Sequence, residues 1–258
     1  MQIFKELYNY REMIASLVKK DLRGRYKGAM LGFLWTFINP LFQLIIYTIV
    51  FSYILKSDIE KYYLFLFVAL IPWIFFQTSL TGGASTIISQ KELVTKIYFP
   101  REVIPISYVT SCFMNMLFCF LIIFVVVLVA QVPITITALL CLPLIMLIEY
   151  ILALGIALIS SAITVYFRDF EHILGIIAMA WMYMTPIIYP LSIVPENFRL
   201  IFQINPMTPI IEAYRDILYL GQVPQTSDLL HALFAGIIVL MIGFIVFSKL
   251  KRHFAEEL

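Results

Sequence analysis

Few residues in this chain have the type and spacing that chemistry requires. The three histidines, His172, His231 and His253, stand far apart, and the three cysteines show no CxxC spacing. A metal site needs several His or Cys at short, regular intervals, so the sequence predicts none. The phosphate-binding loop of nucleotide hydrolases contains a Gly-Lys pair, and this dipeptide does not occur here. The sequence therefore predicts neither catalysis nor nucleotide binding by this chain.

Glu149 is the one acidic residue that lies well inside a long apolar stretch. Carboxyl groups inside a membrane are costly and usually face the protein interior or a water-filled path. A proton-coupled transporter would need more such groups, ideally in pairs. A hydrogen bond between two helices explains a single Glu149 equally well, and the sequence leaves both roles open.

The composition indicates a membrane protein. Of the 258 residues 62% are apolar and 13% are charged, whereas soluble domains have about 45–50% and about 25%. A crossing helix needs about 20 mainly apolar residues, and lipid cannot satisfy open backbone groups. We expect an all-α integral membrane protein with a single domain over residues 1–258. Its six crossing helices are predicted near 30–55, 62–86, 104–130, 137–165, 173–190 and 229–249, with a turn at Gln131-Val132-Pro133 between the third and fourth.

The distribution of Lys and Arg predicts the orientation. Fourteen of these 18 residues lie in the N-terminal segment, the second and fourth connections and the C-terminal tail. Because positive residues favour the cytoplasmic side, both termini are expected in the cytoplasm. The first 27 residues carry ten charges rather than the apolar core of a signal peptide, so we expect no cleavage there.

The N-terminal segment 1–27 has the pattern of an amphipathic interface helix. Over residues 3–22 apolar side chains recur every three or four positions between charged ones, namely Ile3, Leu7, Tyr10, Ile14 and Leu17. Such a helix suits the cytoplasmic headgroup region of a membrane. Docking on protein is the alternative.

Two connections are too long for simple turns. Residues 89–102 (SQKELVTKIYFPRE) predict a short charged helix that docks on another protein, with a solvated connector as the alternative. Residues 191–228 form a long external segment. Within it, residues 200–211 are too few to cross a membrane, and prolines at 206 and 209 interrupt them. We expect a re-entrant or interfacial hairpin, then a short helix near Glu212–Leu220, which together form a lid over a pathway.

Aromatic residues make up 16% of the chain. Sugar rings have apolar faces that stack on aromatic side chains, while Tyr and Trp also offer hydrogen bonds. A path lined by rings would let a glycan slide; ordinary helix packing and lipid contact are the alternative. The candidate lining residues on the first and fifth spans are Trp35, Phe37, Phe42, Tyr47, Phe51, Trp181, Tyr183 and Tyr189.

Five stretches, in this order, resemble one known family: RYKGAMLGFLWTFINPLFQLIIYTIVFSYIL (25–55), KIYFPREVIPIS (96–107), VYFRDFEHIL (165–174), TPIIYP (185–190) and NPMTPIIEAYRDILYLGQ (205–222). The family comprises the membrane subunits of type 2 ABC exporters for bacterial surface polysaccharides of the O-antigen, capsule and teichoic acid types. The resemblance covers essentially the whole chain.

The resemblance implies a homodimer of six-helix subunits in the bacterial cytoplasmic membrane, paired with two copies of a separate ABC ATPase. The substrate would be a lipid-linked polysaccharide, whose lipid enters near the interface helix. ATP and Mg would bind the ATPase, with no cofactor on this chain and no nucleic acid as partner.

The resemblance also implies roles for individual residues. The 89–102 loop is similar to the coupling helix that sits in a groove of the ATPase, and residues 191–222 are similar to external gate helices. The implied residues are Lys91, Glu92, Lys96, Phe99, Arg101, Arg168 and Asp169 for ATPase coupling, and Asn205, Pro206 and Pro209 for the gate.

Three alternatives differ from this expectation. A type 2 ABC exporter of a small lipophilic substrate such as a drug would share the architecture without a long aromatic path. A secondary transporter predicts inverted repeats and several polar sites inside the membrane, of which only Glu149 is present. An intramembrane glycosyltransferase would need an acidic catalytic cluster.

Overall fold

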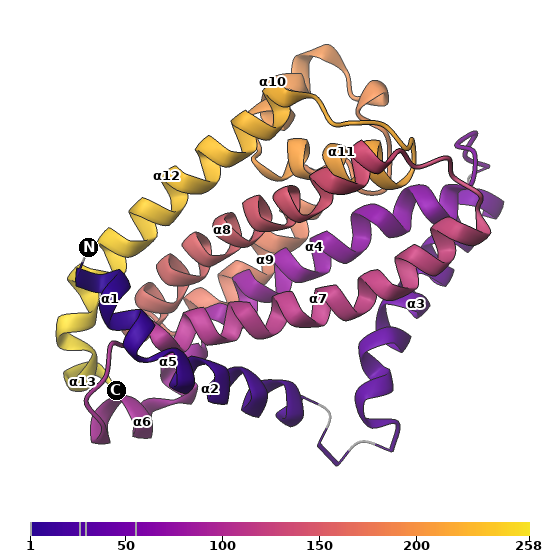
Figure 1. Ribbon diagram of the computed structural model, residues 1–258. Helices are drawn as coiled ribbons and strands as arrows, with labels where there is room; N and C mark the ends of the chain where they lie inside the picture. Colours follow the sequence, from indigo (N-terminus) through magenta and orange to yellow (C-terminus); the bar gives the residue numbers. More distant parts are fainter. Residues whose placement is uncertain (1, 26, 29, 55) are drawn as a thin grey trace.

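The computed structural model describes residues 2–25, 27–28, 30–54 and 56–258, and every regular element in these ranges is a helix (Figure 1). Residues 1 and 26 of the predicted interface segment, and residues 29 and 55 at the predicted first span, lie outside this description. Five helices are long and apolar enough to cross a membrane. They are the composite Gly32–Ile54 with α3 (Trp35–Thr48) at its centre, α4 (Tyr62–Ala84), α7 (Val103–Val129), α8 (Ile136–Tyr166) and α12 (Thr226–Leu250).

These five helices lie close to the boundaries predicted from the apolar runs. The turn expected at residues 131–133 separates α7 from α8, and Gln131 there adopts a positive φ of 53°. The next helix begins at a capped position, because the Thr135 hydroxyl accepts a 3.3 Å hydrogen bond from the Ala138 N–H.

The helix at the predicted fifth span is shorter than expected. The segment 173–190 was predicted to be helical throughout, but α9 ends at Tyr183 after beginning at Phe170. Its 14 residues are about 21 Å long at 1.5 Å per residue, against a hydrocarbon core of about 30 Å. Residues 184–190 form turns, in part because Pro186 and Pro190 supply no backbone N–H. The expected helix through residue 190 is therefore wrong.

The core of the bundle is built around α4 and the α8–α12 pair. Helix α4 is the most buried crossing helix, and Phe67, Trp73 and Phe76 on it are almost completely inaccessible. Helices α8 and α12 approach each other at glycine, since a Cβ on Gly243 would lie 2.5 Å from the carbonyl oxygen of Gly155. Small residues allow such close backbone packing between membrane helices.

The N-terminal segment folds as two helices rather than one. Helix α1 spans Gln2–Asn9 and α2 spans Arg11–Gly24, with a break at Tyr10, whose φ and ψ are −94° and 14°. The expected single helix over 3–22 is wrong in this respect. The break lets both helices turn apolar side chains toward the same core: Leu7, Tyr10, Met13, Ile14 and Leu17 pack against it.

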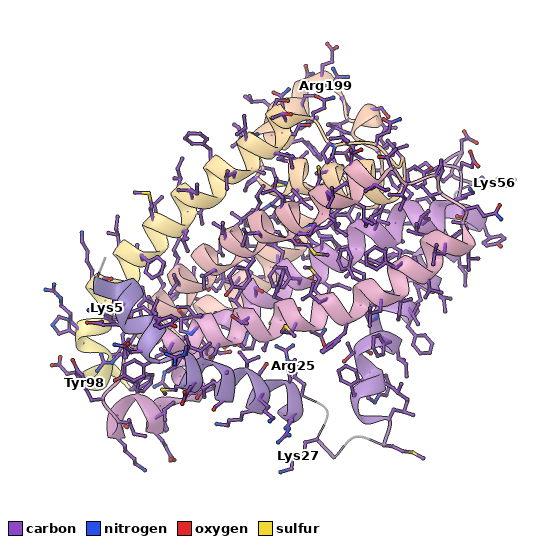
Figure 2. The ribbon with its side chains drawn as sticks, in the orientation of Figure 1. Lys5, Arg25, Lys27, Lys56, Tyr98 and Arg199 are labelled. Carbon is purple, nitrogen blue, oxygen red and sulfur yellow. The ribbon has the colours of Figure 1, made fainter. Side chains whose placement is uncertain are left out.

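The two ends of the bundle carry the segments that do not cross. The chain termini lie at one end with α5 (Thr86–Ser89), α6 (Lys91–Lys96) and α13 (Phe254–Glu257) (Figure 1). Helices α10 (Glu196–Ile204) and α11 (Met207–Leu218) lie toward the opposite end. Figure 2 shows the same separation, with Lys5 and Tyr98 at one end and Lys56 and Arg199 at the other.

The external segment breaks at one proline and not at two. Pro206 lies between α10 and α11, as predicted, but Pro209 is inside the first turn of α11. The backbone N–H groups of a first turn have no partner within the helix, so proline is tolerated there. The expected break at Pro209, and a second helix starting only near Glu212, are both wrong.

Candidate functional site

The loop 89–102 exposes a charged and aromatic surface at the end that carries the termini. The side chains of Lys91, Glu92 and Lys96 on α6 are exposed, and Lys96 and Glu92 form an ion pair at 3.5 Å. Beyond α6 the chain is extended. Tyr98 there is 97% exposed, whereas Phe99 is 6% exposed and belongs to the core. The loop therefore presents Tyr98 outward and anchors itself with Phe99.

The other predicted coupling residues lie at two neighbouring positions. Arg168 and Asp169 are exposed in the turn between α8 and α9. Arg101 is only partly exposed, and its guanidinium donates a hydrogen bond to the Lys251 carbonyl in the C-terminal tail. Arg101 is thus engaged within the chain, while the first two are free to meet a partner's surface.

A polar cluster fixes the end of α2 to α7. The Arg25 guanidinium contacts Asp21 at 2.9 Å and donates a 3.1 Å hydrogen bond to the Ser111 hydroxyl and a 3.0 Å one to the Cys112 sulfur. The Ser111 hydroxyl in turn donates to Asp21. Hydrogen bonds that involve charged groups are stronger than neutral ones, so this cluster sets the position of α2.

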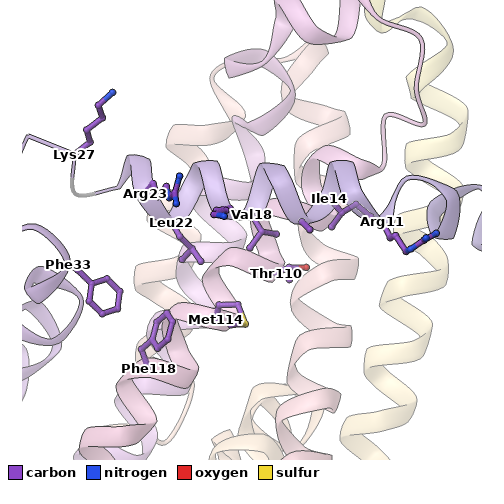
Figure 3. A pocket seen from close by; sticks show the side chains of 12 residues that line it. Arg11, Ile14, Val18, Leu22, Arg23, Lys27, Phe33, Thr110, Met114 and Phe118 are labelled. Carbon is purple, nitrogen blue, oxygen red and sulfur yellow. The ribbon is translucent and has the colours of Figure 1, made fainter.

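A cavity of about 690 Å³ lies between α2 and α7. Figure 3 shows Ile14, Val18 and Leu22 of α2 facing Met114 and Phe118 of α7 across it. Basic residues stand at its margin, namely Arg11, Lys19, Arg23 and Lys27. The combination of an apolar interior and a basic margin suits an amphiphile with an anionic head.

Asn205 connects the external helices to α9. The Trp181 indole N–H donates a 2.8 Å hydrogen bond to the side-chain oxygen Oδ1 of Asn205, and the side-chain amide of Asn205 donates to the Met184 backbone carbonyl at 3.0 Å. The same amide donates to the Thr185 hydroxyl at 2.9 Å, and the Asn205 oxygen also accepts from the N–H of Met207 at 3.0 Å. Asn205 is 7% exposed, so this side chain holds the α10–α11 junction to the end of α9.

Helix α11 is held in the bundle by two buried side chains. The Tyr214 hydroxyl donates a 2.7 Å hydrogen bond to Glu149 of α8. Arg215 donates to Glu212 and to the Ile187 carbonyl, and its guanidinium lies 3.6 Å from the ring centre of Phe65. Burial lowers the pKa of Arg215 to about 10.

The predicted aromatic residues differ in exposure and in their ring contacts. Phe42 and Tyr183 are 58% and 60% exposed on the outside of the helix bundle. Phe51 stacks on Tyr62 at 5.8 Å, and Trp181 meets Phe76 edge-on at 5.0 Å. The remaining four, Trp35, Phe37, Tyr47 and Tyr189, are partly exposed.

Sequence reasoning missed several of these residues. Tyr214 carried no signal beyond its place in the external segment. Arg215 is one of the four positive residues outside the predicted cytoplasmic segments, and nothing in the sequence indicates that it is only 3% exposed. The sequence singles out Glu149 but not its partner, which is the Tyr214 hydroxyl. Within the described ranges, no three His, Cys, Asp or Glu side chains gather in a way that could hold a metal ion.

Comparison with protein-family models places most of the chain in one family. The model described as ABC-2 type transporter matches residues 12–219. The chain belongs to the ABC-2 type transporter family. Members of this family are transport subunits that work with an ABC ATPase on a separate chain.

Several curated proteins are similar to this chain over most of its length. The O-antigen export system permease protein RfbA of Myxococcus xanthus is 33% identical over 261 residues, 100% of both chains. A protein of the same name from Klebsiella pneumoniae is 33% identical over 248 residues, 96% of this chain and 95% of the relative. The polysialic acid transport protein KpsM of Escherichia coli is 23% identical over 234 residues, 89% of this chain and 90% of the relative. This ABC-2 transporter chain is a multi-pass protein of the bacterial cytoplasmic membrane.

Proposed function

We propose that this chain is the transmembrane subunit of an ATP-driven exporter that moves a lipid-linked polysaccharide across the cytoplasmic membrane. The observation that carries the proposal is the likeness over the full chain to permeases named for O-antigen export. The cytoplasmic surface, the α2–α7 cavity and the external helices supply the three parts that such a subunit needs.

In this proposal the chain crosses the membrane six times with both termini in the cytoplasm. Helix α9 makes the additional crossing, the fifth in chain order, together with the irregular residues 184–190. Residues 185–188 of this stretch are buried, and the Ile187 carbonyl accepts a hydrogen bond from Arg215 of α11. The position of both termini at the Tyr98 end of the bundle supports this topology. Two copies form a homodimer, and each pairs with one ABC ATPase that binds ATP and Mg.

The loop 89–102 is the proposed coupling element. Lys91, Glu92 and Lys96 supply its charged face, and the exposed side chain of Tyr98 supplies an aromatic anchor of the kind that dominates protein interfaces. Arg168 and Asp169 form a second contact. Phe99 supports the loop from within the protein.

The cavity between α2 and α7 is the proposed place where the lipid carrier enters. Its apolar interior accommodates part of a hydrocarbon chain, and the basic residues at its margin pair with the phosphates of the carrier. Beyond the cavity, the glycan passes between two protomers along the exposed aromatics of α3 and α9, of which Phe42 and Tyr183 are the most accessible. Helices α10 and α11, joined at Asn205 and Pro206, form the external gate.

The second candidate is export of a small lipophilic substrate. The largely apolar lining of the 690 Å³ cavity favours it, because such a cavity would also hold a drug-sized molecule. The two functions differ in what accumulates when the transporter is lost.

Deletion of the chain tests the proposal. In a strain without it, lipid-linked polymer should accumulate on the cytoplasmic side while surface polymer disappears, and a plasmid copy should restore both. A deletion strain with normal surface polymer would refute polysaccharide export. Accumulation of a small lipophilic compound instead of polymer would favour the second candidate.

A further inference from the structure

The C-terminal tail, residues 250–258, lies against the loop 89–102 and the cytoplasmic end of α8. We propose that the tail is a transmission element that makes the loop, α8 and α12 move as one unit. This inference rests on the proposed coupling of loop 89–102 to an ATPase, and it assigns to the tail a role in that coupling.

The first contact joins the tail to the base of the loop. The Lys251 ammonium forms an ion pair with Glu102, which is 1% exposed at the start of α7. The neighbouring Arg101 donates a hydrogen bond to the Lys251 carbonyl. One residue of the tail is thus bound through both its side chain and its backbone by two consecutive residues of the loop.

The second contact is made by the buried ring of Phe254. Phe254 is 0% exposed, and the Arg101 guanidinium lies 5.8 Å from the centre of its ring. The ring also meets Phe247 of α12 at 5.5 Å and Tyr166 of α8 at 6.3 Å. A cation over an aromatic face is attractive, and the effect grows when water is excluded. Phe254 therefore links the loop, α12 and α8 in one cluster.

The third contact ties the end of α8 to Leu250, where α12 ends and the tail begins. The Tyr166 hydroxyl donates a 2.7 Å hydrogen bond to the Leu250 carbonyl. Tyr166 stands two residues before Arg168, so the tail reaches the second proposed ATPase contact as well as the first. A displacement imposed on either contact would reach the tail directly.

The buried carboxylate shows why this junction resists separation. Glu102 Oε2 has no hydrogen-bond partner among the described residues. The bond between Oε1 and Lys251 is therefore what offsets the cost of burying this carboxylate. Breaking a buried ion pair leaves an uncompensated charge and is strongly unfavourable. Helices α8 and α12 are in turn packed at Gly155 and Gly243. A rigid path therefore leads from the loop into two crossing helices.

The test uses the assembled permease–ATPase complex in nanodiscs. Lys251→Met removes the ion pair, Tyr166→Phe removes only a hydroxyl, and Lys249→Met changes an exposed lysine of the same region as a matched control. Spin labels at Thr95 and Ile245, both exposed, report the distance between loop and α12. Separately, polymer delivered per ATP hydrolysed is measured in proteoliposomes.

In the wild type and in Lys249→Met, the label distance should be the same with ADP as with ATP and vanadate. In Lys251→Met it should broaden and differ between the two nucleotides, and polymer delivered per ATP should fall by about fivefold or more. The charge exchange Glu102→Lys with Lys251→Glu should restore the ratio to within about twofold of the wild type. Should Lys251→Met not assemble, Tyr166→Phe carries the same measurements.

Two results would overturn the inference. One is a wild-type distance and delivery ratio in both Lys251→Met and Tyr166→Phe. The other is a lower rate of polymer delivery in variants with a lower melting temperature, while the polymer delivered per ATP hydrolysed stays at the wild-type value. The label distance needs no polymer, so a wild-type complex that passes this measurement but exports no polysaccharide would refute the proposed function and leave the tail's role intact.

Discussion

The hydroxyl of Tyr214 on α11 lies 2.7 Å from a carboxylate oxygen of Glu149 on α8, and both side chains are fully buried. The other oxygen of Glu149 has no hydrogen-bond partner among the described residues. The phenol is therefore the contact that compensates this carboxyl for its burial. It joins the proposed external gate to the helix that packs most closely with α12.

Removal of that hydroxyl should destabilise the permease. Tyr214→Phe leaves Glu149 buried without its donor and should lower the free energy of unfolding by about 1–3 kcal/mol, measured by thermal unfolding in nanodiscs. Tyr63→Phe, at an exposed tyrosine, is the control. Glu149→Gln keeps an acceptor for the phenol and should retain export, whereas abolished export in a stable Glu149→Gln variant would point to proton transfer instead.

Truncation of Tyr98 should weaken binding of the ATPase. Its exposed ring is the proposed anchor of loop 89–102, and aromatic anchors contribute about 2 kcal/mol or more at interfaces, so Tyr98→Ala should reduce affinity roughly tenfold or more. Titration of the purified ATPase against permease nanodiscs measures it. Tyr53→Ala changes another exposed tyrosine, at the opposite end, and should bind normally. Equal affinity for both variants would remove Tyr98 from the interface.

Glycine is required where α8 meets α12. A methyl group at Gly243 would lie 2.5 Å from the Gly155 carbonyl oxygen, so Gly243→Ala must push the two backbones apart. We expect a loss of about 1–3 kcal/mol in stability. Gly175→Ala on α9 meets nothing within 4 Å and should be neutral or stabilising by up to about 1 kcal/mol. Melting temperatures of the two variants give the answer, and equal values would contradict the packing argument.

Asp216 on α11 should make stability depend on pH. Burial, with Glu212 and Asp228 nearby, raises the pKa of Asp216 to about 6. A carboxyl with a higher pKa in the folded state favours folding while it is protonated, and this advantage is lost as pH rises through that value. The melting temperature of the wild type should therefore fall relative to Asp216→Asn between about pH 4 and about pH 7.

The comparison of the two melting curves isolates Asp216 from other titrating groups. Asp58→Asn, at an exposed acidic residue of the 56–61 loop, serves as the reference. Parallel pH profiles for the wild type and Asp216→Asn would show that the charge on Asp216 has no energetic cost.

Filling the α2–α7 cavity should block export. Met114→Trp adds a bulky ring to a lining position and should lower the export rate by about tenfold if the lipid carrier enters there. Met241→Trp, at an exposed position on α12, is the matched control. Export is measured as surface polymer per permease copy. Wild-type export by a folded Met114→Trp variant would exclude the cavity from the route.

The crossing helices were predictable because length and hydropathy determine them locally. Five apolar runs became helices close to their predicted limits. The remaining run, predicted as the fifth span, gave the shorter helix α9, because Pro186 and Pro190 do not supply the backbone N–H groups that would continue it. The break at Tyr10 was equally hidden, since the spacing of apolar residues continues through it.

The individual side-chain contacts of the site could not be predicted from local sequence patterns. Tyr214 and Glu149 are 65 positions apart, and nothing in either neighbourhood indicates the other. In the extended stretch after α6, sequence alone could not decide which of the adjacent rings, Tyr98 or Phe99, would face outward. The roles assigned to the coupling, lining and gate residues remain predictions.

The contacts of Phe254 and Lys251 have a consequence while the chain is being synthesised. Loop 89–102 leaves the ribosome well before residues 250–258, so until the tail is made Arg101 and Glu102 have no Lys251 or Phe254 to bind. In a nascent chain the loop 89–102 would lack its contacts with the tail, so the surface proposed to bind the ATPase would be incompletely formed. The contacts proposed to transmit movement would thus also delay binding of the ATPase until residues 250–258 have been made.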